Sequence, residues 1–220
     1  MGSAIGQTLG NAVGVAISPI PMIALTLMLF SRSASRNSLS FLAGWLVGLT
    51  AVGLVVIAIG FGSSSGETDS GGVLKIVIGL GLLALAWKQW SSRPRDGAPT
   101  EMPGWMAAID DLTGVKAFGM GLLLTVPNPK NVGLTIAAAA TISAAGLERG
   151  EEVATLAVFV FVASITIIVP VIGYLLASER ITPALDATKE WLTSNSNTVM
   201  AVLFVVLGAK LLGDGIAVVA

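Results

Sequence analysis

Six apolar segments run along the chain of 220 residues, separated by polar or turn-rich stretches. A bilayer core about 30 Å thick needs about 20 apolar residues of helix to cross it. Segments of about this length lie near residues 4–30, 39–61, 73–90, 117–144, 153–177 and 199–219. The pattern predicts an all-α integral membrane protein with six transmembrane helices.

The composition agrees with a membrane protein and excludes most chemistry. Hydrophobic residues make up 54% of the chain and charged residues 11%, against roughly 25% charged in a soluble domain. The chain has no Cys and no His, which removes disulfides, thiol redox chemistry and the side chain best suited to proton transfer near neutral pH. The sequence also has no GxxxxGK[ST] nucleotide-binding loop. We expect no enzyme, no metal and no cofactor.

Basic residues concentrate on alternate loops and predict an orientation. Eight of the twelve lie in or beside the loops after the first, third and fifth segments: Arg32, Arg36, Lys88, Arg93, Arg95, Lys116, Arg180 and Lys189. The N-terminal tail and the other two loops contain only Arg149. Since cytoplasmic loops carry the excess of Lys and Arg, we expect a multi-pass protein of the cell (plasma) membrane with both termini outside the cytoplasm. Two of the connecting pieces, "PGWMAAIDDLTG" and "PALDATKEWL", are expected to form short amphipathic helices on the cytoplasmic surface.

Two Pro-x-Pro pairs indicate an internal repeat. Pro19 and Pro21 lie in "AISPIPMIAL", and Pro127 and Pro129 lie 108 positions later in "LTVPNPKNVG". Each pair interrupts the first helix of a three-helix half, and the two halves have opposite orientations. Broken helices at corresponding positions of inverted repeats are the best sequence pointer to a transporter site. We therefore predict one transmembrane domain, 1–220, made of repeat one (1–90), a cytoplasmic connector (91–116) and repeat two (117–220).

Proline has no N–H and its ring crowds the carbonyl four residues earlier. The pairs should therefore free the carbonyls of Val15, Ile17, Leu123 and Thr125, which cannot stay unpaired in lipid. New half-helices should begin near Met22 and Lys130, and their N-terminal dipoles attract an anion. The alternative is that each pair only kinks its helix.

A lysine lies near the middle of the fourth segment. An ammonium there costs at least about 2.5 kcal/mol on insertion scales, so Lys130 needs a partner, either a substrate anion or the freed carbonyls. Alternatively it caps the broken helices and binds no substrate. The predicted substrate-binding residues are Ser18, Pro19, Pro21, Thr125, Pro127, Asn128, Pro129, Lys130 and Asn131.

Lys210 and Asp214 stand four residues apart in the last segment, where they can neutralise one another. A structural pair is the first interpretation, and an ion- or proton-coupling role for Asp214 with Lys210 is the alternative. Small residues recur every four positions and predict close helix packing, with a homodimer permitted. They are Gly6, Gly10, Gly14 and Ser18 in the first segment and Gly44 and Gly48 in the second.

Several motifs resemble the lysine-exporter (LysE) superfamily of small membrane exporters. "ISPIPMIAL", "GWMAAIDDLTGVKAFGMGLLL" running into "PNPKN", and "LGAKLLGDGI" are most similar to its GAP/Sap branch of glycolipid- and sulfolipid-addressing proteins. The resemblance implies membrane transport, with this branch associated with moving glycolipids toward the cell surface. Thiol-transporting relatives carry cysteines beside these prolines, and this chain has none, so their electron-transfer route is excluded.

Three hypotheses follow. In the first, the protein moves a glycolipid or lipid-linked substrate through a midplane site that opens sideways between helices. In the second, it is a proton-driven exporter of an amino acid or other small solute, with an enclosed, water-accessible cavity. In the third, it is a non-transporting scaffold of a lipid export complex. The expected partners are membrane lipids and the glycolipid or small-molecule substrate, with no nucleic acid.

Overall fold

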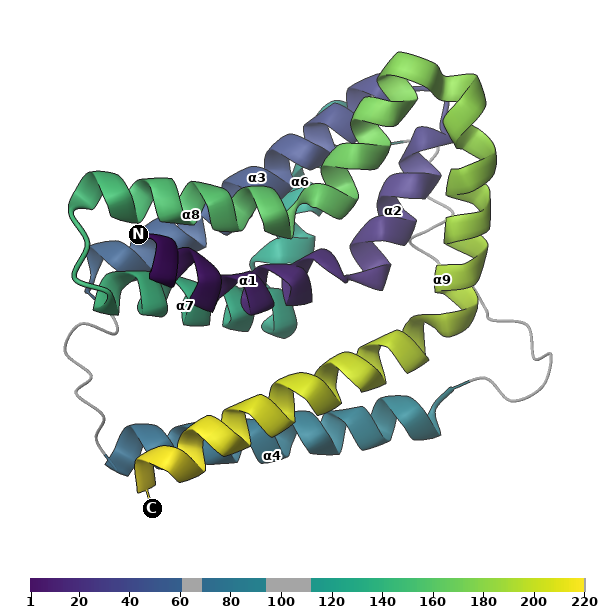
Figure 1. Cartoon of the computed structure of the whole chain (residues 1–220). Coiled ribbons are helices and arrows are strands. Elements are labelled where there is room, and N and C mark those ends of the chain that lie inside the picture. Colours follow the sequence, from purple (N-terminus) through teal and green to yellow (C-terminus); the bar gives the residue numbers. More distant parts are fainter. Residues whose placement is uncertain (61–68, 94–111, 220) are drawn as a thin grey trace. The chain divides into compact units, whose positions relative to one another are not determined.

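The computed structural model describes residues 1–60, 69–93 and 112–219, and these parts of the chain are helical with short connections (Figure 1). Their helices are α1 (Gly2–Ala16), α2 (Pro19–Leu29), α3 (Ala34–Ala58), α4 (Asp69–Ser91), α6 (Gly114–Thr125), α7 (Pro129–Ala144), α8 (Arg149–Ala163) and α9 (Ile165–Val219). No strand occurs in the described residues. The all-α prediction is confirmed for them.

Two described helices are long and apolar enough to cross a membrane by themselves, α3 and the Ile165–Ala217 part of α9. The pair α1 and α2 meets the same test together but is bent by 56° at its break. Shorter apolar helices cover Ile76–Ser91 and Gly114–Thr125. Length and composition thus support a membrane protein with two or three clear spans, and the number six stays a prediction.

The fifth and sixth predicted segments differ from the structure. The expected continuous helix 153–177 is interrupted at Ser164, where α8 ends. The polar stretch after it, expected as a loop with an amphipathic connector, is helical within α9, which has one kink at Ala177. Ala, Leu, Glu and Lys are strong helix formers, so the polar composition of 178–198 does not break the helix. The other amphipathic connector, "PGWMAAIDDLTG" at 103–114, falls mostly on 94–111, outside the described residues.

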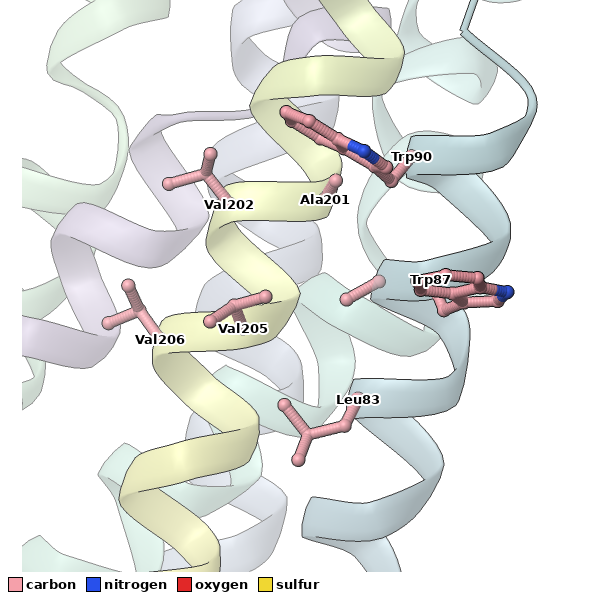
Figure 2. A pocket seen from close by; sticks show the side chains of 8 residues that line it. Leu83, Trp87, Trp90, Ala201, Val202, Val205 and Val206 are labelled. Carbon is pink, nitrogen blue, oxygen red and sulfur yellow. The ribbon is translucent and has the colours of Figure 1, made fainter.

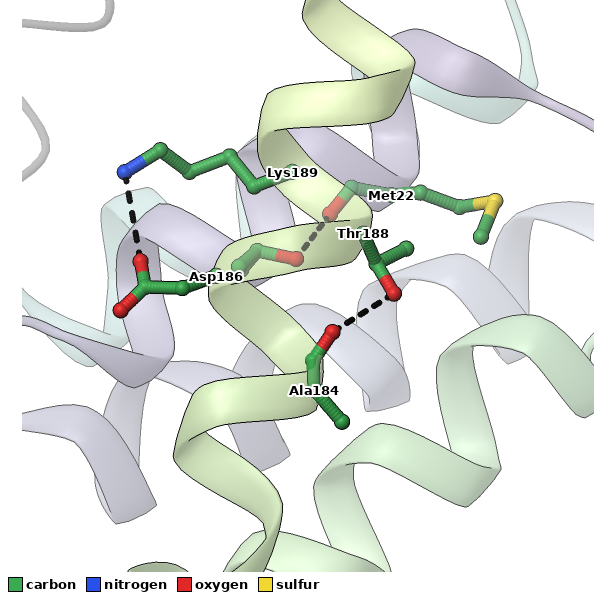
Figure 3. Close-up of polar contacts among 6 residues, drawn as sticks. Met22, Ala184, Asp186, Thr188 and Lys189 are labelled. Carbon is green, nitrogen blue, oxygen red and sulfur yellow. Dashed lines mark hydrogen bonds and ion pairs between the residues drawn. The ribbon is translucent and has the colours of Figure 1, made fainter.

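Figure 3 shows side-chain contacts that support this part of α9. Thr188 Oγ1 donates a hydrogen bond to the Ala184 carbonyl at 2.7 Å, and Lys189 Nζ lies 3.8 Å from Asp186 Oδ1. The Lys189 ammonium also lies 5.4 Å from the centroid of the Phe30 ring, directly after α2. This segment of α9 is therefore a helix placed beside the end of α2.

The described residues form two compact units, of which the first comprises 1–60 and 112–190. Helix α3 packs against α6 and α7 in this unit, and α1 packs against α7 and α8. Phe41, Trp45 and Leu49 of α3 are fully buried. A side chain at Gly44 or Gly48 would collide with the backbone of Phe118 or with Thr125 of α6. The predicted close approach at these glycines is confirmed.

The glycine pattern in α1 gives the opposite result. Gly6 and Gly10 have open space beside them, and only Gly14 approaches a neighbour, Leu134 of α7. The buried small residues of α1 are instead Ala4, Thr8, Ala12 and Ala16, which also recur every four positions. No described residue of the chain packs against Gly6 or Gly10, so the predicted close packing there is not found within the chain, and a homodimer at these glycines stays a prediction. Two stripes of small residues share α1, and the alanine stripe faces the core.

The second unit comprises 69–93 and 191–219, where α4 and the C-terminal part of α9 lie side by side. The two helices cross where Gly79 meets Gly208. A Cβ on either glycine would lie 2.9 Å from the other's carbonyl oxygen. Only residues without a side chain allow this approach, as in close helix crossings of membrane proteins.

Candidate functional site

Both Pro-x-Pro pairs mark real helix breaks. Ile17 and Ser18 separate α1 from α2 and form break one; α2 begins at Pro19 and not near Met22 as expected. The residues between Thr125 and Pro129 separate α6 from α7 and form break two; α7 begins next to Lys130 as predicted. Proline is favoured at the first position of a helix because the N–H it lacks has no helical partner there. Pro19 and Pro129 therefore occupy equivalent positions. Equivalent residues of the two breaks are thus two positions further apart in the chain than the equivalent prolines of the two Pro-x-Pro motifs.

Lys130 reaches from α7 into the break between α1 and α2. Its Nζ donates hydrogen bonds to the Gly14 carbonyl at 2.7 Å, the Ile17 carbonyl at 2.9 Å and Ser18 Oγ at 2.7 Å. An ammonium has three donors, and all three are paired here. The side chain is only 6% exposed. The lysine of one break thus supplies the hydrogen bonds that the other break lacks.

Ser18 and Asn131 join the same network. Ser18 Oγ lies 2.6 Å from the Val15 carbonyl and 3.0 Å from Asn131 Oδ1, and either oxygen can accept its single proton. Asn131 Nδ2 donates to the Leu124 carbonyl at 3.0 Å. Both residues are buried. The structure therefore brings Ser18, Lys130 and Asn131 together, as the sequence predicts.

The remaining predicted site residues surround this network without entering it. Asn128 caps α7, its Oδ1 accepting from the backbone N–H groups of Lys130 and Asn131 at 3.1 and 3.4 Å. Thr125 Oγ1 bonds the Gly121 and Leu122 carbonyls of its own helix. Among the four prolines, Pro19 and Pro21 are buried, whereas Pro127 and Pro129 are exposed.

Two of the carbonyls predicted to lose their helical partner have other partners in the structure. The Val15 carbonyl accepts from Ser18 and the Ile17 carbonyl from Lys130. In the second break the carbonyl that receives a side chain is that of Leu124, one residue away from the two expected positions. Break one therefore matches the proline argument more closely than break two does.

A third break, which the sequence analysis missed, contacts the same region. Buried Ser164 separates α8 from α9, and Trp45 Nε1 of α3 donates to its Oγ at 3.1 Å. Thr166 Oγ1, at the start of α9, donates to the Ala16 carbonyl of break one at 2.7 Å. The signal was available in "ASITIIVP", where two hydroxyl residues stand in an apolar run shortly before Pro170.

The charge of the site is unbalanced. Lys130 is the one charged side chain that is buried among the described residues. In the same part of the chain, no carboxylate lies within ion-pair distance of its ammonium. Lys210 and Asp214 do pair, at 2.7 Å, but they belong to the second unit and are 61% and 45% exposed at their side chains. Their geometry is that of a structural pair, and a coupling role for Asp214 stays a prediction.

Each unit also has an apolar groove. In the first unit, a groove of about 360 Å³ runs between α3 and α8, with Thr50 as the polar residue in its wall. In the second, a groove of about 300 Å³ runs between α4 and α9, with Trp87 and Trp90 on one wall and valines on the other (Figure 2). Both grooves are open to their surroundings.

The helical fold, the apolar spans and the polar network at the helix breaks define an integral membrane protein with a buried cationic site. The chain matches the model of the family described as "Sap, sulfolipid-1-addressing protein" over residues 8–217, and it belongs to that family. This agrees with the resemblance to the GAP/Sap branch. No curated protein and no solved structure matches the chain significantly.

Proposed function

We propose that the protein is a transporter of the cell membrane that moves a glycolipid or lipid-linked substrate toward the cell surface. The observation that carries the proposal is the buried Lys130 ammonium, which has neutral hydrogen-bond partners and no carboxylate where two broken helices meet. A buried positive charge without a counter-ion favours an anionic group nearby. A polar or anionic headgroup would bind when one of its oxygens replaces a backbone carbonyl as a hydrogen-bond acceptor of the Lys130 ammonium.

The groove between α3 and α8 supports a lipid over a small solute. It is apolar and open to the side, and it belongs to the same unit as the Lys130 network. Trp45, whose hydrogen bond to Ser164 joins α3 to the α8–α9 break, directly precedes the groove residue Leu46 in the chain. A headgroup near Lys130 could therefore keep its acyl chains in a hydrocarbon environment, as a sideways-opening transporter requires.

An inverted repeat is part of this proposal. Suppose that α1, α2 and α3 of the first repeat correspond to α6, α7 and the α8 region of the second. The contact between α1 and α8 should then have an equivalent contact between α6 and α3, and the contact between α2 and α3 should have one between α7 and α8. Both reciprocal pairs are in contact. We infer six spans with both termini outside the cytoplasm from this reciprocity and the loop charges.

One observation favours the scaffold as a second candidate. All three donors of Lys130 are used inside the protein, so the lysine is satisfied without a substrate. A scaffold predicts that Lys130→Ala keeps function in cells. It also predicts that Gly10→Leu abolishes function, because Gly10 faces open space where a partner could pack.

A strain that lacks the protein separates these candidates. Surface-extractable lipids and excreted amino acids are profiled together after complementation with wild type, Lys130→Ala, Lys210→Ala or Gly10→Leu, at equal protein levels in the membrane. We expect wild type and Lys210→Ala to restore a missing surface lipid and Lys130→Ala to fail. Unchanged lipids with lost amino-acid efflux would overturn the lipid proposal. Full restoration by Lys130→Ala with loss in Gly10→Leu would replace it by the scaffold.

A further inference from the structure

The groove in the second unit has a distinct chemical pattern at one end. Trp87 and Trp90, near the end of α4, both line the groove, and Arg93 follows two residues after the helix ends at Ser91. The Arg93 guanidinium lies 3.8 Å from the centroid of the Trp90 ring. Lys88 adds a second cation in the last turn of α4. The groove therefore ends at a cationic and aromatic rim.

Away from this rim the groove is hydrocarbon. Leu83 and Ala86 of α4 line it. The facing wall is made of Val202, Val205 and Val206 of α9 (Figure 2). This wall contains no aromatic ring and no charged side chain, and its three valines are each at least half exposed. Near the rim, Asn197 Nδ2 donates to the Ser92 carbonyl at 2.8 Å, which ties α9 to the end of α4.

The combination fits one kind of molecule. Tryptophan side chains favour the headgroup level of a bilayer, with the ring in the apolar region and the N–H toward water. Lys88 and Arg93 belong to the loop set that the charge pattern places in the cytoplasm, and anionic phospholipids are enriched in the cytoplasmic leaflet. The volume of about 300 Å³ is at the lower end of the range for small-molecule sites.

We propose that this groove binds an anionic phospholipid of the cytoplasmic leaflet. One acyl chain lies between α4 and α9 against Leu83 and Val205, and the phosphate contacts Arg93, while Lys88 lies on another side of α4. The two cations also interact favourably with the C-terminal dipole of α4, a role that requires no lipid. The site lies in a different unit from Lys130 and does not depend on transport.

Photolabelling of the full-length protein in phosphatidylcholine vesicles tests the proposal. Two probes are added in turn, a phosphatidylglycerol and a phosphatidylcholine with the same diazirine-bearing acyl chain, and labelled residues are mapped by mass spectrometry. One basic residue near an anionic surface corresponds to about a fivefold preference. We expect at least that excess of phosphatidylglycerol label on the groove residues of α4 and α9, and we expect salt to reduce it.

Two variants with matched controls complete the test. Arg93→Gln should remove about fivefold of the preference, whereas Arg36→Gln, an exposed arginine of α3, should leave it unchanged. Val205→Phe should fill the groove and remove the label of both probes, whereas Val169→Phe, at an exposed position elsewhere in α9, should not. Equal labelling by the two probes, or an unchanged preference in Arg93→Gln, would overturn the proposal and leave the cations their helix-dipole role.

Discussion

Ser18 and Asn128 occupy the same position, directly before the proline that begins a half-helix, yet they make different hydrogen bonds. Asn128 caps its own helix by accepting from the Lys130 and Asn131 backbones. Ser18 makes no cap bond to α2 and instead contacts Val15, Asn131 and Lys130. The prolines differ as well, since those of break one are buried and those of break two are exposed.

Break two therefore makes its hydrogen bonds with its own residues, whereas break one depends on donors from other helices. The carbonyls of Gly14, Ala16 and Ile17 all accept hydrogen bonds from side chains of other helices, namely Lys130 of α7 and Thr166 of α9. In the inverted repeat that we propose, break one supplies the hydrogen-bond acceptors and break two supplies the donor side chain of Lys130. This explains why one break carries a lysine and the other does not.

The largest expected effect comes from removing the donor. Lys130→Met keeps the apolar stem but leaves the buried Gly14 carbonyl and the part-buried Ile17 carbonyl without their donor. Each unpaired buried group costs about 1–3 kcal/mol, and the loss is partly offset because a buried charge is removed. We expect the free energy of unfolding to fall by about 3 kcal/mol, measured by reversible unfolding of the purified protein in mixed micelles.

The same substitution at Lys210 is the control. Lys210→Met breaks an exposed ion pair, and such pairs contribute about 0–1 kcal/mol. Equal effects of the two substitutions would mean that the break one carbonyls do not depend on Lys130.

A smaller effect is expected at Asn131, which contacts both breaks. Asn131→Leu has a similar size but loses the bond to the Leu124 carbonyl and the contact with Ser18. We expect a loss of about 2 kcal/mol in the free energy of unfolding, from the same assay. Asn195→Leu, at an exposed asparagine of α9, should change it by less than about 0.5 kcal/mol. A neutral Asn131→Leu would show that the two breaks are independent.

The smallest effect is expected at Thr166, the second outside donor to break one. Thr166→Val is close in shape and removes the bond to Ala16, so we expect a loss of about 1 kcal/mol. Thr141→Val is the matched control, because Thr141 bonds only the Ala137 carbonyl of its own helix and is half-exposed. If the two variants have the same stability, the third helix break does not support break one.

Local rules predicted the breaks and much of their chemistry. Proline stereochemistry placed both breaks and identified the freed carbonyls of Val15 and Ile17, and the cost of a buried ammonium required partners for Lys130. The sequence did not reveal which stripe of small residues on α1 faces the core, because Gly6, Gly10 and Ala12 are all small enough for close packing. The break at Ser164 has a local signal in "ASITIIVP", but its hydrogen bond to Trp45 joins residues more than one hundred positions apart, and no local pattern contains such a contact.

The central claim is that the two breaks meet in one site. The chain has no cysteine, so a pair of introduced thiols can be followed without background. Ser18→Cys with Asn131→Cys replaces two side chains whose oxygens are 3.0 Å apart, and Ser18→Cys with Thr141→Cys places the second thiol about 15 Å further along α7. Both variants are treated in native membranes with a short bifunctional thiol reagent, and the thiols left free are counted by mass tagging. The account predicts that the first pair is cross-linked and the second is not; free thiols in both pairs at normal protein levels would contradict it.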